Sequence, residues 1–444
     1  MTSVQIPVQA PGQKPVESSV QALIEKHFAI AHGCLQLQGL SIEDIAETYG
    51  TPLYIYDAGV IKAQLAQLRQ ALPERFQISY SMKANPCAAV LKLFLSQGCG
   101  LEVASAGEYE RAIAAGCPPE KILFAGPGKT EQELSTVLSQ GIGEIHAESM
   151  TELARIGRLS DELGVTANVA VRVNPTSEVQ GGAMQMGGKP APFGIDEERL
   201  DEALCFIASA PTLNFRGIHL FVGTQVLDAE VLIAQYRKGL AIARYAAQYL
   251  DQPLATLDFG GGLGIPYFAR EQSLDLNRLQ VGLQALMAEV EDDDYLRDTQ
   301  FLVEPGRFLV GECGLYVARV NDIKVSRGKK FAILDGGMHH HLAASGNLGQ
   351  VIKRNYPVAV VNKLDQEPMG AVEVVGPLCT PLDAIARNIA LPKLKVGDLI
   401  GVFQSGAYAR AASPLGFLSH PTPPEVWIEN GQAVLVSERR PYAH

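Results

Sequence analysis

Phe76-Gln77-Ile78-Ser79-Tyr80-Ser81-Met82-Lys83-Ala84-Asn85 is the stretch of sequence that decides the fold. Its first half is rich in aromatic and apolar residues and predicts a strand that ends near Lys83. Residues 88–97 follow with apolar side chains at helical spacing. A buried strand that leads directly into a helix is the repeating unit of an α/β fold.

The same alternation of short apolar strands and helical stretches continues from residue 55 to residue 306. It predicts parallel βαβ units, and eight strands would close a (β/α)8 TIM-like barrel, in which reactive groups lie at the carboxyl ends of the strands. The expected strands are residues 77–80, 101–103, 122–125, 144–147, 168–173, 215–221, 256–259 and 301–304. The clearest helical stretches are residues 61–72, 88–97, 108–115, 151–163 and 231–250.

The rest of the chain has a different pattern. Residues 307–444 contain β-rich segments broken by Gly, Pro and Asn, and no long helical period, so we expect a second, C-terminal β-sheet or β-barrel domain. Its expected strands are residues 316–323, 331–334, 357–361, 371–375, 399–403 and 433–437. Residues 1–33, which begin with a stretch rich in Gln, Pro, Val and Ser, are expected to form a flexible leader.

The composition excludes several classes of protein. The chain has 444 residues, 47% of them hydrophobic, which is enough for a large core and two domains. A net charge of -11 without a basic cluster argues against a nucleic-acid partner. No apolar run reaches the roughly 18 to 20 residues of a membrane span, and no signal pattern is present, so we expect a cytoplasmic protein. The seven scattered cysteines suit a reducing compartment.

Five short segments carry chemistry in a fixed order. A lysine held at a strand end, as Lys83 is, can form a Schiff base with pyridoxal phosphate. Residues 258–264, Asp-Phe-Gly-Gly-Gly-Leu-Gly, allow backbone N–H groups to approach a phosphate. Three later segments add further groups: a carboxylate with an arginine in residues 304–307, a thiol with an acid in residues 376–383, and a phenol in residues 405–408. Each segment alone also has a purely structural explanation, such as a solvated lysine, a turn or a packed tyrosine.

Taken together and in this order, the segments resemble the fold-type III pyridoxal phosphate decarboxylases, the family of diaminopimelate, ornithine and arginine decarboxylases. Residues 103–108, 172–175, 193–194 and 335–338 also match, so the resemblance extends from about residue 50 to about residue 425. It implies that residues 34–54 pack with the β domain. It also implies a head-to-tail homodimer whose active sites are shared between subunits.

The resemblance assigns roles to single residues. Lys83 would hold the cofactor, Glu304 would keep its pyridine nitrogen protonated so that the ring accepts the electrons left by departing CO2, and Cys379 of the partner subunit would then supply a proton. Thr380, Asp383 and His339 are the candidates for substrate contacts. The further cofactor-binding candidates are Glu102, Arg172, His219, Phe221, Thr224, Gly261, Gly262, Gly264, Gly306, Arg307 and Tyr408.

Departures from the family pattern bear on the substrate. Phe221 stands where diaminopimelate decarboxylases usually have a histidine that stacks on the cofactor, and Thr224 replaces the usual serine. Thr380 and Pro381 follow Cys379, where the family has an acid that grips the substrate's distal amine. A charge-assisted contact of that kind is worth roughly 1.5 to 3 kcal/mol, so a distal ammonium would be poorly held.

A further departure is His339-His340-His341, in place of the segment that holds the distal carboxylate of diaminopimelate. Adjacent histidines cannot easily converge on one metal ion, and pyridoxal chemistry needs none, so no metal site is expected. We expect a loop that lines the substrate entrance.

These features resemble the branch of the family that includes the decarboxylase of glutamate tethered to an acyl carrier protein; residues 184–188 belong to the same pattern. The leading hypothesis is therefore a decarboxylase of an amino acid or of a carrier-tethered aminoacyl group. The pair Lys353 and Arg354 could contact an acidic carrier, although such a pair also suits a solvated face. The alternatives are a decarboxylase of free diaminopimelate, ornithine or lysine, and a catalytically silent regulatory protein.

Overall fold

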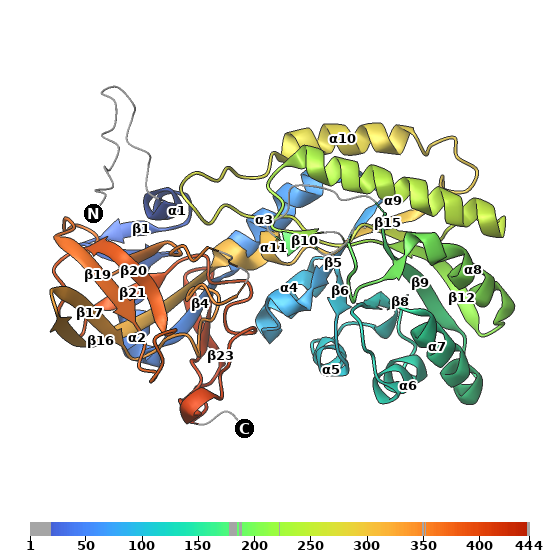
Figure 1. Cartoon of the computed structure of the whole chain (residues 1–444). Coiled ribbons are helices and arrows are strands. Elements are labelled where there is room, and N and C mark those ends of the chain that lie inside the picture. Colours follow the sequence, from blue (N-terminus) through green and yellow to red (C-terminus); the bar gives the residue numbers. More distant parts are fainter. Residues whose placement is uncertain are drawn as a thin grey trace, which may run out of the picture.

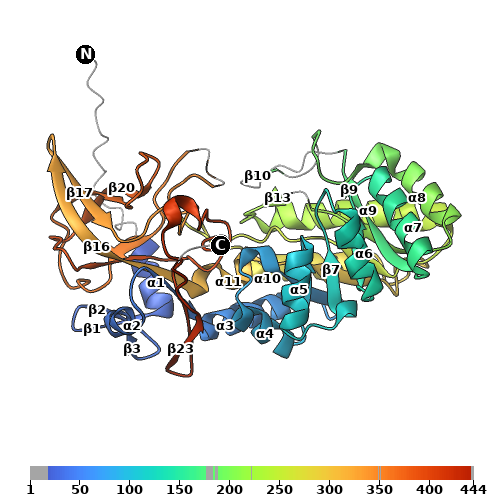
Figure 2. The same cartoon turned by 90° about the horizontal axis from the view of Figure 1, so that it is seen from below.

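The computed structural model describes residues 19–176, 184–185, 189–221, 223–348, 350 and 352–441. Figures 1 and 2 show two parts side by side, a helix-rich barrel and a smaller β domain. The N-terminal strands and helices lie with the β domain, next to segments from the C-terminal third of the chain. Among the described residues no helix is both long enough and apolar enough to pass through a bilayer.

The first part is a closed barrel of eight parallel strands, which confirms the prediction. Strand β15 pairs with β5, and β8 pairs with β9, so the sheet closes on itself. The strands are β5 Phe76–Ser81, β6 Gly100–Val103, β7 Ile122–Phe124, β8 Glu144–Ala147, β9 Ala167–Asn174, β12 Leu213–His219, β14 Thr256–Asp258 and β15 Gln300–Val303. Strand β12 ends at His219, so Phe221 lies beyond the strand that was predicted to include it.

Helices surround the barrel (Figure 1). Several begin at a Ser, Thr or Asp whose side chain accepts a backbone N–H of the first turn, as Ser105, Thr130 and Ser149 do. These caps fix the residue at which each of these helices begins. The helices are α3 Ala58–Ala71, α4 Ala88–Ser96, α5 Ala106–Ala114, α6 Glu131–Ser139, α7 Met150–Leu163, α8 Leu200–Ser209, α9 Ala229–Leu250 and α10 Leu276–Ala288.

The β domain is built around the long strand β16 Gly314–Ser326. Its main sheet has the order β20-β19-β17-β16-β4-β22-β23, and β21 joins β16 to β18. Sequence analysis missed β20 and β22, because neither has a clean alternation of polar and apolar residues. The strands are β4 Leu53–Asp57, β17 Lys329–Leu334, β18 Val358–Val360, β19 Gly370–Val375, β20 Ala384–Leu391, β21 Leu399–Val402, β22 Glu425–Glu429 and β23 Gln432–Ser437.

The N-terminal segment packs on this domain. Strand β2 Cys34–Leu37 and helix α2 Ile42–Tyr49 bury Leu35, Leu37 and Ile42 against residues of β16, β21 and β22. The backbone N–H of Leu35 donates to the carbonyl of Val361 at 2.8 Å. This is the arrangement that the family resemblance implied for residues 34–54. Strands β1 Ala29–Ala31 and β3 Leu40–Ser41 complete a small sheet with β2.

The structure corrects the prediction of a flexible leader over residues 1–33. Ser19–His27 forms helix α1, whose Leu23 and Ile24 are buried. Lys26 and His27 lie 2.6 and 2.7 Å from the buried carboxylate of Glu312. Burial opposes ionisation of Glu312, but the two basic side chains outweigh it and lower its pKa. The first part of the expected leader, residues 1–18, lies outside the described residues.

Hydrogen bonds connect the β domain to the carboxyl end of the barrel, and two of them involve the loop after β5. The N–H of Tyr408 donates to the carbonyl of Ala84 at 2.8 Å, and the side-chain amide of Asn85 donates to the carbonyl of Gly406 at 3.0 Å. The loop after β5 therefore lies against residues 405–408 of the β domain. This contact brings two of the predicted motifs together.

Candidate active site

Lys83 lies just after β5, in a turn formed by Met82–Ala84. Its ammonium is 3.1 and 3.2 Å from the two carboxylate oxygens of Glu102, a residue of the neighbouring strand β6 that is almost fully buried. The hydroxyl of Ser81 donates to the same carboxylate. Burial disfavours the charged amine, but Glu102, Tyr408 and Glu304 outweigh that effect and raise the pKa of Lys83. The lysine is thus held at a defined place.

A cavity of about 440 Å³ opens beside this lysine. Lys83 and Tyr408 line it, together with the basic side chains of Arg111 and Arg410. The Lys83 side chain remains 40% exposed, although its partner Glu102 is buried. A small molecule can therefore reach the amine from this side.

Arg307 and Tyr408 form the next part of the site. The guanidinium carbon of Arg307 lies 4.7 Å from the centre of the Tyr408 ring, and one of its N–H groups donates to the Tyr267 hydroxyl at 3.0 Å. The Nε of Arg307 is buried and makes no hydrogen bond within the described part of the chain. An arginine with an unused donor is suited to bind an anion.

The glycine loop after β14 approaches the backbone of its neighbours closely. A Cβ atom at Gly261 would lie 2.6 Å from the carbonyl oxygen of Glu304, and one at Gly262, where φ is +104°, would lie 2.8 Å from the carbonyl oxygen of Gly223. A Cβ at Gly264 would lie 2.9 Å from the backbone of Gln225. Short strand β13 Gly223–Thr224, paired with β10 Met184–Gln185, brings Thr224 to this loop.

Phe221 lies between two cations. The Lys83 ammonium and the guanidinium carbon of Arg172 are each 5.8 Å from the centre of its ring. Arg172 also faces the ring of Phe193 at 5.1 Å and pairs with the Glu148 carboxylate at 2.6 Å. This geometry places Phe221 where a flat cofactor attached to Lys83 could stack.

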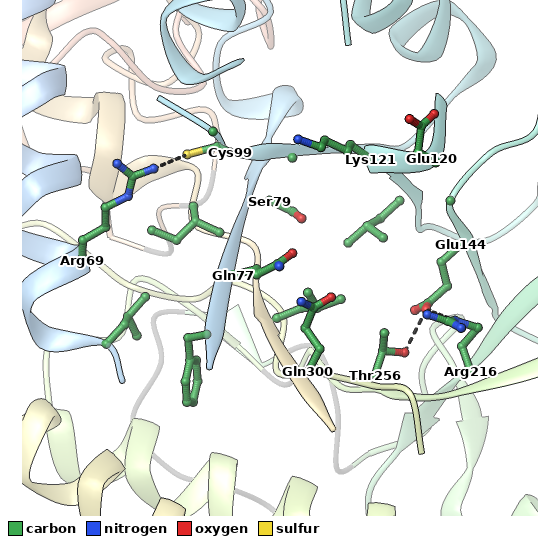
Figure 3. Close-up of a pocket in the computed structure, with 18 of the residues that line it drawn as sticks. Arg69, Gln77, Ser79, Cys99, Glu120, Lys121, Glu144, Arg216, Thr256 and Gln300 are labelled. Atoms are coloured by element: carbon green, nitrogen blue, oxygen red, sulfur yellow. Dashed lines mark hydrogen bonds and ion pairs between the residues drawn. The ribbon is translucent and has the colours of Figure 1, made fainter. Parts of the chain in front are cut away.

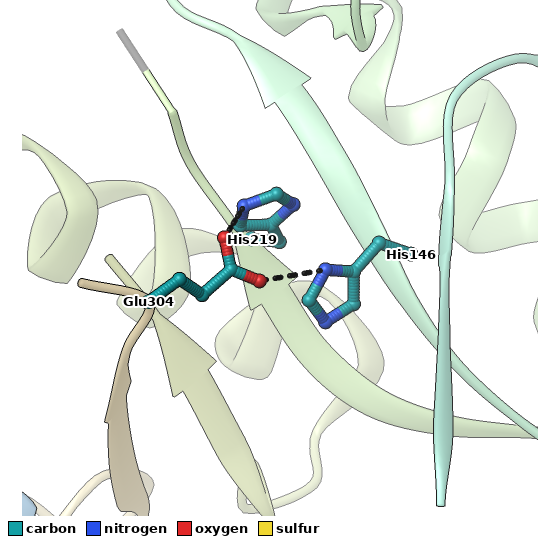
Figure 4. A group of neighbouring side chains, drawn as sticks. All are labelled: His146, His219 and Glu304. Atoms are coloured by element: carbon teal, nitrogen blue, oxygen red, sulfur yellow. Dashed lines mark ion pairs between the residues drawn. The ribbon is translucent and has the colours of Figure 1, made fainter. Parts of the chain in front are cut away.

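Glu304, directly after β15, lies between two imidazoles (Figure 4). Its Oε2 is 3.5 Å from Nε2 of His219, and its Oε1 is 3.7 Å from Nδ1 of His146. All three side chains are buried. Burial, followed by the nearby His146 and Arg172, lowers the pKa of His219 well below its usual value, so His219 is neutral. The site thus holds a buried carboxylate and a half-buried lysine.

A family model described as the pyridoxal-binding domain of pyridoxal-dependent decarboxylases matches residues 58–311, which is more than half of the chain. The chain belongs to this family.

Named relatives agree with the assignment. The decarboxylase is 37% identical over 408 residues to L-glutamyl-[BtrI acyl-carrier protein] decarboxylase of Niallia circulans, which covers 91% of this chain and 95% of the relative. It is 30% identical over 414 residues to diaminopimelate decarboxylase of Aquifex aeolicus, covering 92% and 94% of the two chains. The crystal structure of diaminopimelate decarboxylase from M. jannaschi superposes with a TM-score of 0.85 at 27% identity, covering 94% and 95%. The chain is therefore a carboxy-lyase.

The described residues fit pyridoxal phosphate. The cofactor needs an amine for its aldehyde, an acid facing its ring nitrogen and donors for its phosphate. Lys83 is accessible, and Oε1 of Glu304 and Nε of Arg307 are buried atoms without a hydrogen-bond partner among the described residues. The donor atoms of Glu304, His146 and His219 lie within 4.8 Å of one another, a spacing that a metal ion can also bridge. Because the cofactor ring needs the same carboxylate, we interpret this trio as a buried polar cluster around that carboxylate.

Cys379 lies in the loop between β19 and β20 of the β domain. Its side chain is exposed, and it is not among the residues that line the cavity beside Lys83. Within one chain, the structure does not bring the predicted proton donor to the lysine.

Asp383 has a different role from the substrate contact that we predicted. It is almost fully buried, and both of its carboxylate oxygens accept backbone hydrogen bonds, from Met338 at 2.6 Å and from Leu378 at 2.8 Å. Burial raises its pKa, and these two N–H groups oppose the rise. Asp383 therefore closes its own loop, with a backbone N–H bound to each of its oxygens.

The three consecutive histidines do not line a substrate entrance. His339, His340 and His341 are at most 1% exposed, inside the β domain. His340 contacts the Pro421 carbonyl and His341 the Ser405 hydroxyl, each at 2.9 Å, while the His339 ring packs 3.7 Å from that of His340. Burial lowers their pKa values to about 4, 2 and 3, respectively. They are neutral core residues.

Sequence reasoning missed three polar residues of the barrel interior: Glu144, His146 and Asp258. A signal was present for the first two. They lie two residues apart in the otherwise apolar strand β8, so both side chains point to the same, interior face.

Proposed function

We propose that the chain is a pyridoxal phosphate decarboxylase that acts on an amino acid or on an aminoacyl group tethered to an acyl carrier protein. The observation that supports the tethered substrate is the loop of residues 376–383. Both oxygens of its one acid, Asp383, accept hydrogen bonds from backbone N–H groups. Thr380 and Pro381 in the same loop are neutral. This loop therefore offers no free carboxylate to a distal ammonium. A tethered substrate has no distal charge to hold.

In this proposal each part of the site acts on the cofactor. Pyridoxal phosphate, when bound, supplies the electron sink for loss of CO2. Lys83 would hold the cofactor through its side-chain amine. Glu304 holds a proton at the ring nitrogen. Phe221 packs against the ring face, since a phenyl ring can stack although it cannot donate a hydrogen bond.

The phosphate end is assigned to backbone and side-chain donors. Arg307 has an unused N–H, and the close-packed glycine loop leaves its backbone exposed for lack of side chains. We assign phosphate contacts to Gly261, Gly262, Gly264, Gly306, Thr224, Arg307 and Tyr408.

The proton donor is assigned to Cys379 of a second subunit. Its exposure in the β domain leaves it available to a partner chain, in keeping with a head-to-tail homodimer. The proposal includes that homodimer and a cytoplasmic location. Cys379→Ala is expected to slow product formation while the cofactor still binds.

A second candidate function is the decarboxylation of a free basic amino acid: diaminopimelate, ornithine or lysine. It is favoured by the likeness to diaminopimelate decarboxylases over nearly the whole chain, in sequence and in structure. The two functions differ in whether a distal charge must be bound.

Mass spectrometry of CO2 loss separates them. Cofactor-loaded protein is offered free glutamate, ornithine, lysine and diaminopimelate, and in parallel an acyl carrier protein loaded with a glutamyl group. We expect a loss of about 44 Da, the mass of CO2, and only from the carrier-bound substrate. Turnover of a free diamino acid would refute the tethered substrate and show that its distal charge is bound elsewhere.

A further inference from the structure

The barrel interior contains a row of buried polar side chains that the proposed mechanism does not use. Glu144 and His146 point inward from β8, and Asp258 lies at the end of β14. Each is at most 3% exposed. Polar groups are rarely buried in a barrel core without a partner or a role.

The row leads from one end of the barrel to the other. Nε2 of His146 is 3.1 Å from Oε1 of Glu144, towards the amino end of the strands. Nδ1 of His146 faces Oε1 of Glu304 at 3.7 Å, towards the carboxyl end (Figure 4). These last two atoms are both buried and make no hydrogen bond to any described residue. His146 therefore lies between two carboxylates.

Glu144, although almost fully buried, borders an open cavity at the amino end of the barrel. It lines a cavity of about 450 Å³ together with Arg216, Thr256, Gln77 and Gln300 (Figure 3). Its Oε2 accepts from the Thr256 hydroxyl at 2.8 Å and lies 3.9 Å from Nε of Arg216, which is 37% exposed. A proton on His146 can thus exchange with water through this end, away from the cofactor.

Donor and acceptor counts determine the form of His146 that suits this position. A carboxylate only accepts hydrogen bonds, and a neutral imidazole has one N–H. Only an imidazolium presents an N–H to both carboxylates at once: Nε2–H to Glu144 at 3.1 Å and Nδ1–H towards Glu304 at 3.7 Å. We propose that His146 is a positioning residue: as an imidazolium fixed by Glu144, it holds Glu304 in the ionised form and in the orientation that faces the cofactor's ring nitrogen.

The other charged and titratable groups around His146 are compatible with this role. Its Nε2 lies 3.9 Å from Asp258, whose pKa is raised well above its usual range by burial and by the Glu304 and Glu144 carboxylates, so burial there disfavours a charge on Asp258. The His219 ring, 4.2 Å away, is neutral, and Lys129 donates to the His146 carbonyl. Arg172 approaches from β9 but pairs with Glu148.

The test compares His146→Asn, Glu304→Gln and the double variant. Asn keeps a donor for Glu144 but cannot carry a charge. Cofactor affinity, measured by absorbance titration, is expected to fall about tenfold or more in His146→Asn, because Glu304 loses the charged ring that faces its Oε1 at 3.7 Å. In the Glu304→Gln background the same change is expected to have less than a threefold effect, because His146 acts only through Glu304. Equal effects in both backgrounds would overturn the proposal.

A second measurement needs no stable variant. ¹⁵N spectra of histidine-labelled protein with cofactor should show a histidine with both ring nitrogens protonated at pH 7.5; its absence, or stoichiometric metal in the purified protein, would refute an imidazolium at His146. His340→Asn, which removes a buried imidazole of the β domain, is the control and should leave cofactor affinity unchanged. The proposal rests on the proposed cofactor role of Glu304. Neither readout needs a substrate, so an error in the substrate assignment would not affect it.

Discussion

Acid should destabilise the β domain through its buried neutral histidines. His339, His340 and His341 have folded-state pKa values of about 4, 2 and 3, against the ordinary 6.5. The folded chain therefore binds fewer protons than the unfolded chain once the pH falls below about 6.5. Stability contributed by neutral histidines is complete above that pH and is lost progressively as the pH falls towards the folded-state values.

The expected size depends little on the exact folded-state values, because all three are below 5.5. Each histidine takes up close to one proton on unfolding at pH 5.5 and almost none at pH 7.5. When the pH falls from 7.5 to 5.5, proton uptake by each unfolded histidine lowers the unfolding free energy by about 1.4 kcal/mol. The three together lower it by about 4 kcal/mol. Carboxyl groups whose pKa is raised in the folded chain, such as Asp383, make the folded chain more stable as the pH falls, and so oppose the effect of the histidines. The contribution of one histidine is therefore measured by comparing a variant with the unchanged chain.

Urea unfolding at pH 7.5 and 5.5 provides the assay. The chain has one tryptophan, Trp427 of β22, which is 7% exposed, so its fluorescence reports on the β domain. His341→Asn should reduce the loss of unfolding free energy between the two pH values by about 1.4 kcal/mol relative to the unchanged chain. His32→Asn, at an exposed position, is the matched control and should not alter the loss. Equal losses in the His341→Asn and unchanged chains would refute the reasoning.

Three further predictions concern buried charge, cofactor attachment and the glycine loop. Lys129→Met should cost about 3 to 5 kcal/mol of unfolding free energy, because it leaves the buried carboxylate of Glu152 without its partner at 2.7 Å. The control is Lys62→Met, which removes an exposed ion pair of similar length. It should cost less than about 1 kcal/mol in the same urea titration. Lys83→Ala should abolish the absorbance of covalently attached cofactor, and an unchanged spectrum would disprove the lysine assignment. Gly261→Ala should weaken cofactor binding at least tenfold in an absorbance titration, because its Cβ would lie 2.6 Å from the Glu304 carbonyl oxygen. Gly107→Ala, whose nearest contact would be at 3.9 Å, should leave cofactor binding unchanged.

The barrel and the lysine could be predicted from sequence because each depends on local signals. The barrel strands are short apolar runs that alternate with helices, and Lys83 and Glu304 come directly after two of them. Parallel strands in a barrel place such residues at one end, so sequence position alone brings them together. The structure places Phe221 near Lys83, and Arg172 near Phe221, for the same reason.

The remaining features depend on contacts between distant segments. The spacing of Glu144 and His146 in one strand was a local signal, but that His146 faces Glu304 could not be predicted, because Glu304 comes from another strand across the barrel interior. Asp383 was interpreted as a substrate contact, yet whether an acid faces a ligand or its own backbone is decided by how the loop closes. Helix α1 was interpreted as a flexible leader because its anchor, Glu312, lies far along the sequence.

Strand β4 has a consequence for how the chain is made in the cell. It pairs with β16, which begins at residue 314, and with β22, which begins at residue 425. Leu53, Tyr54, Ile55 and Tyr56 are at most 1% exposed in the finished protein. During translation this apolar strand emerges first and must wait, without partners, until the whole barrel has left the ribosome. The nascent chain therefore exposes an aggregation-prone apolar segment for most of its synthesis. A holding chaperone would be expected to bind this segment.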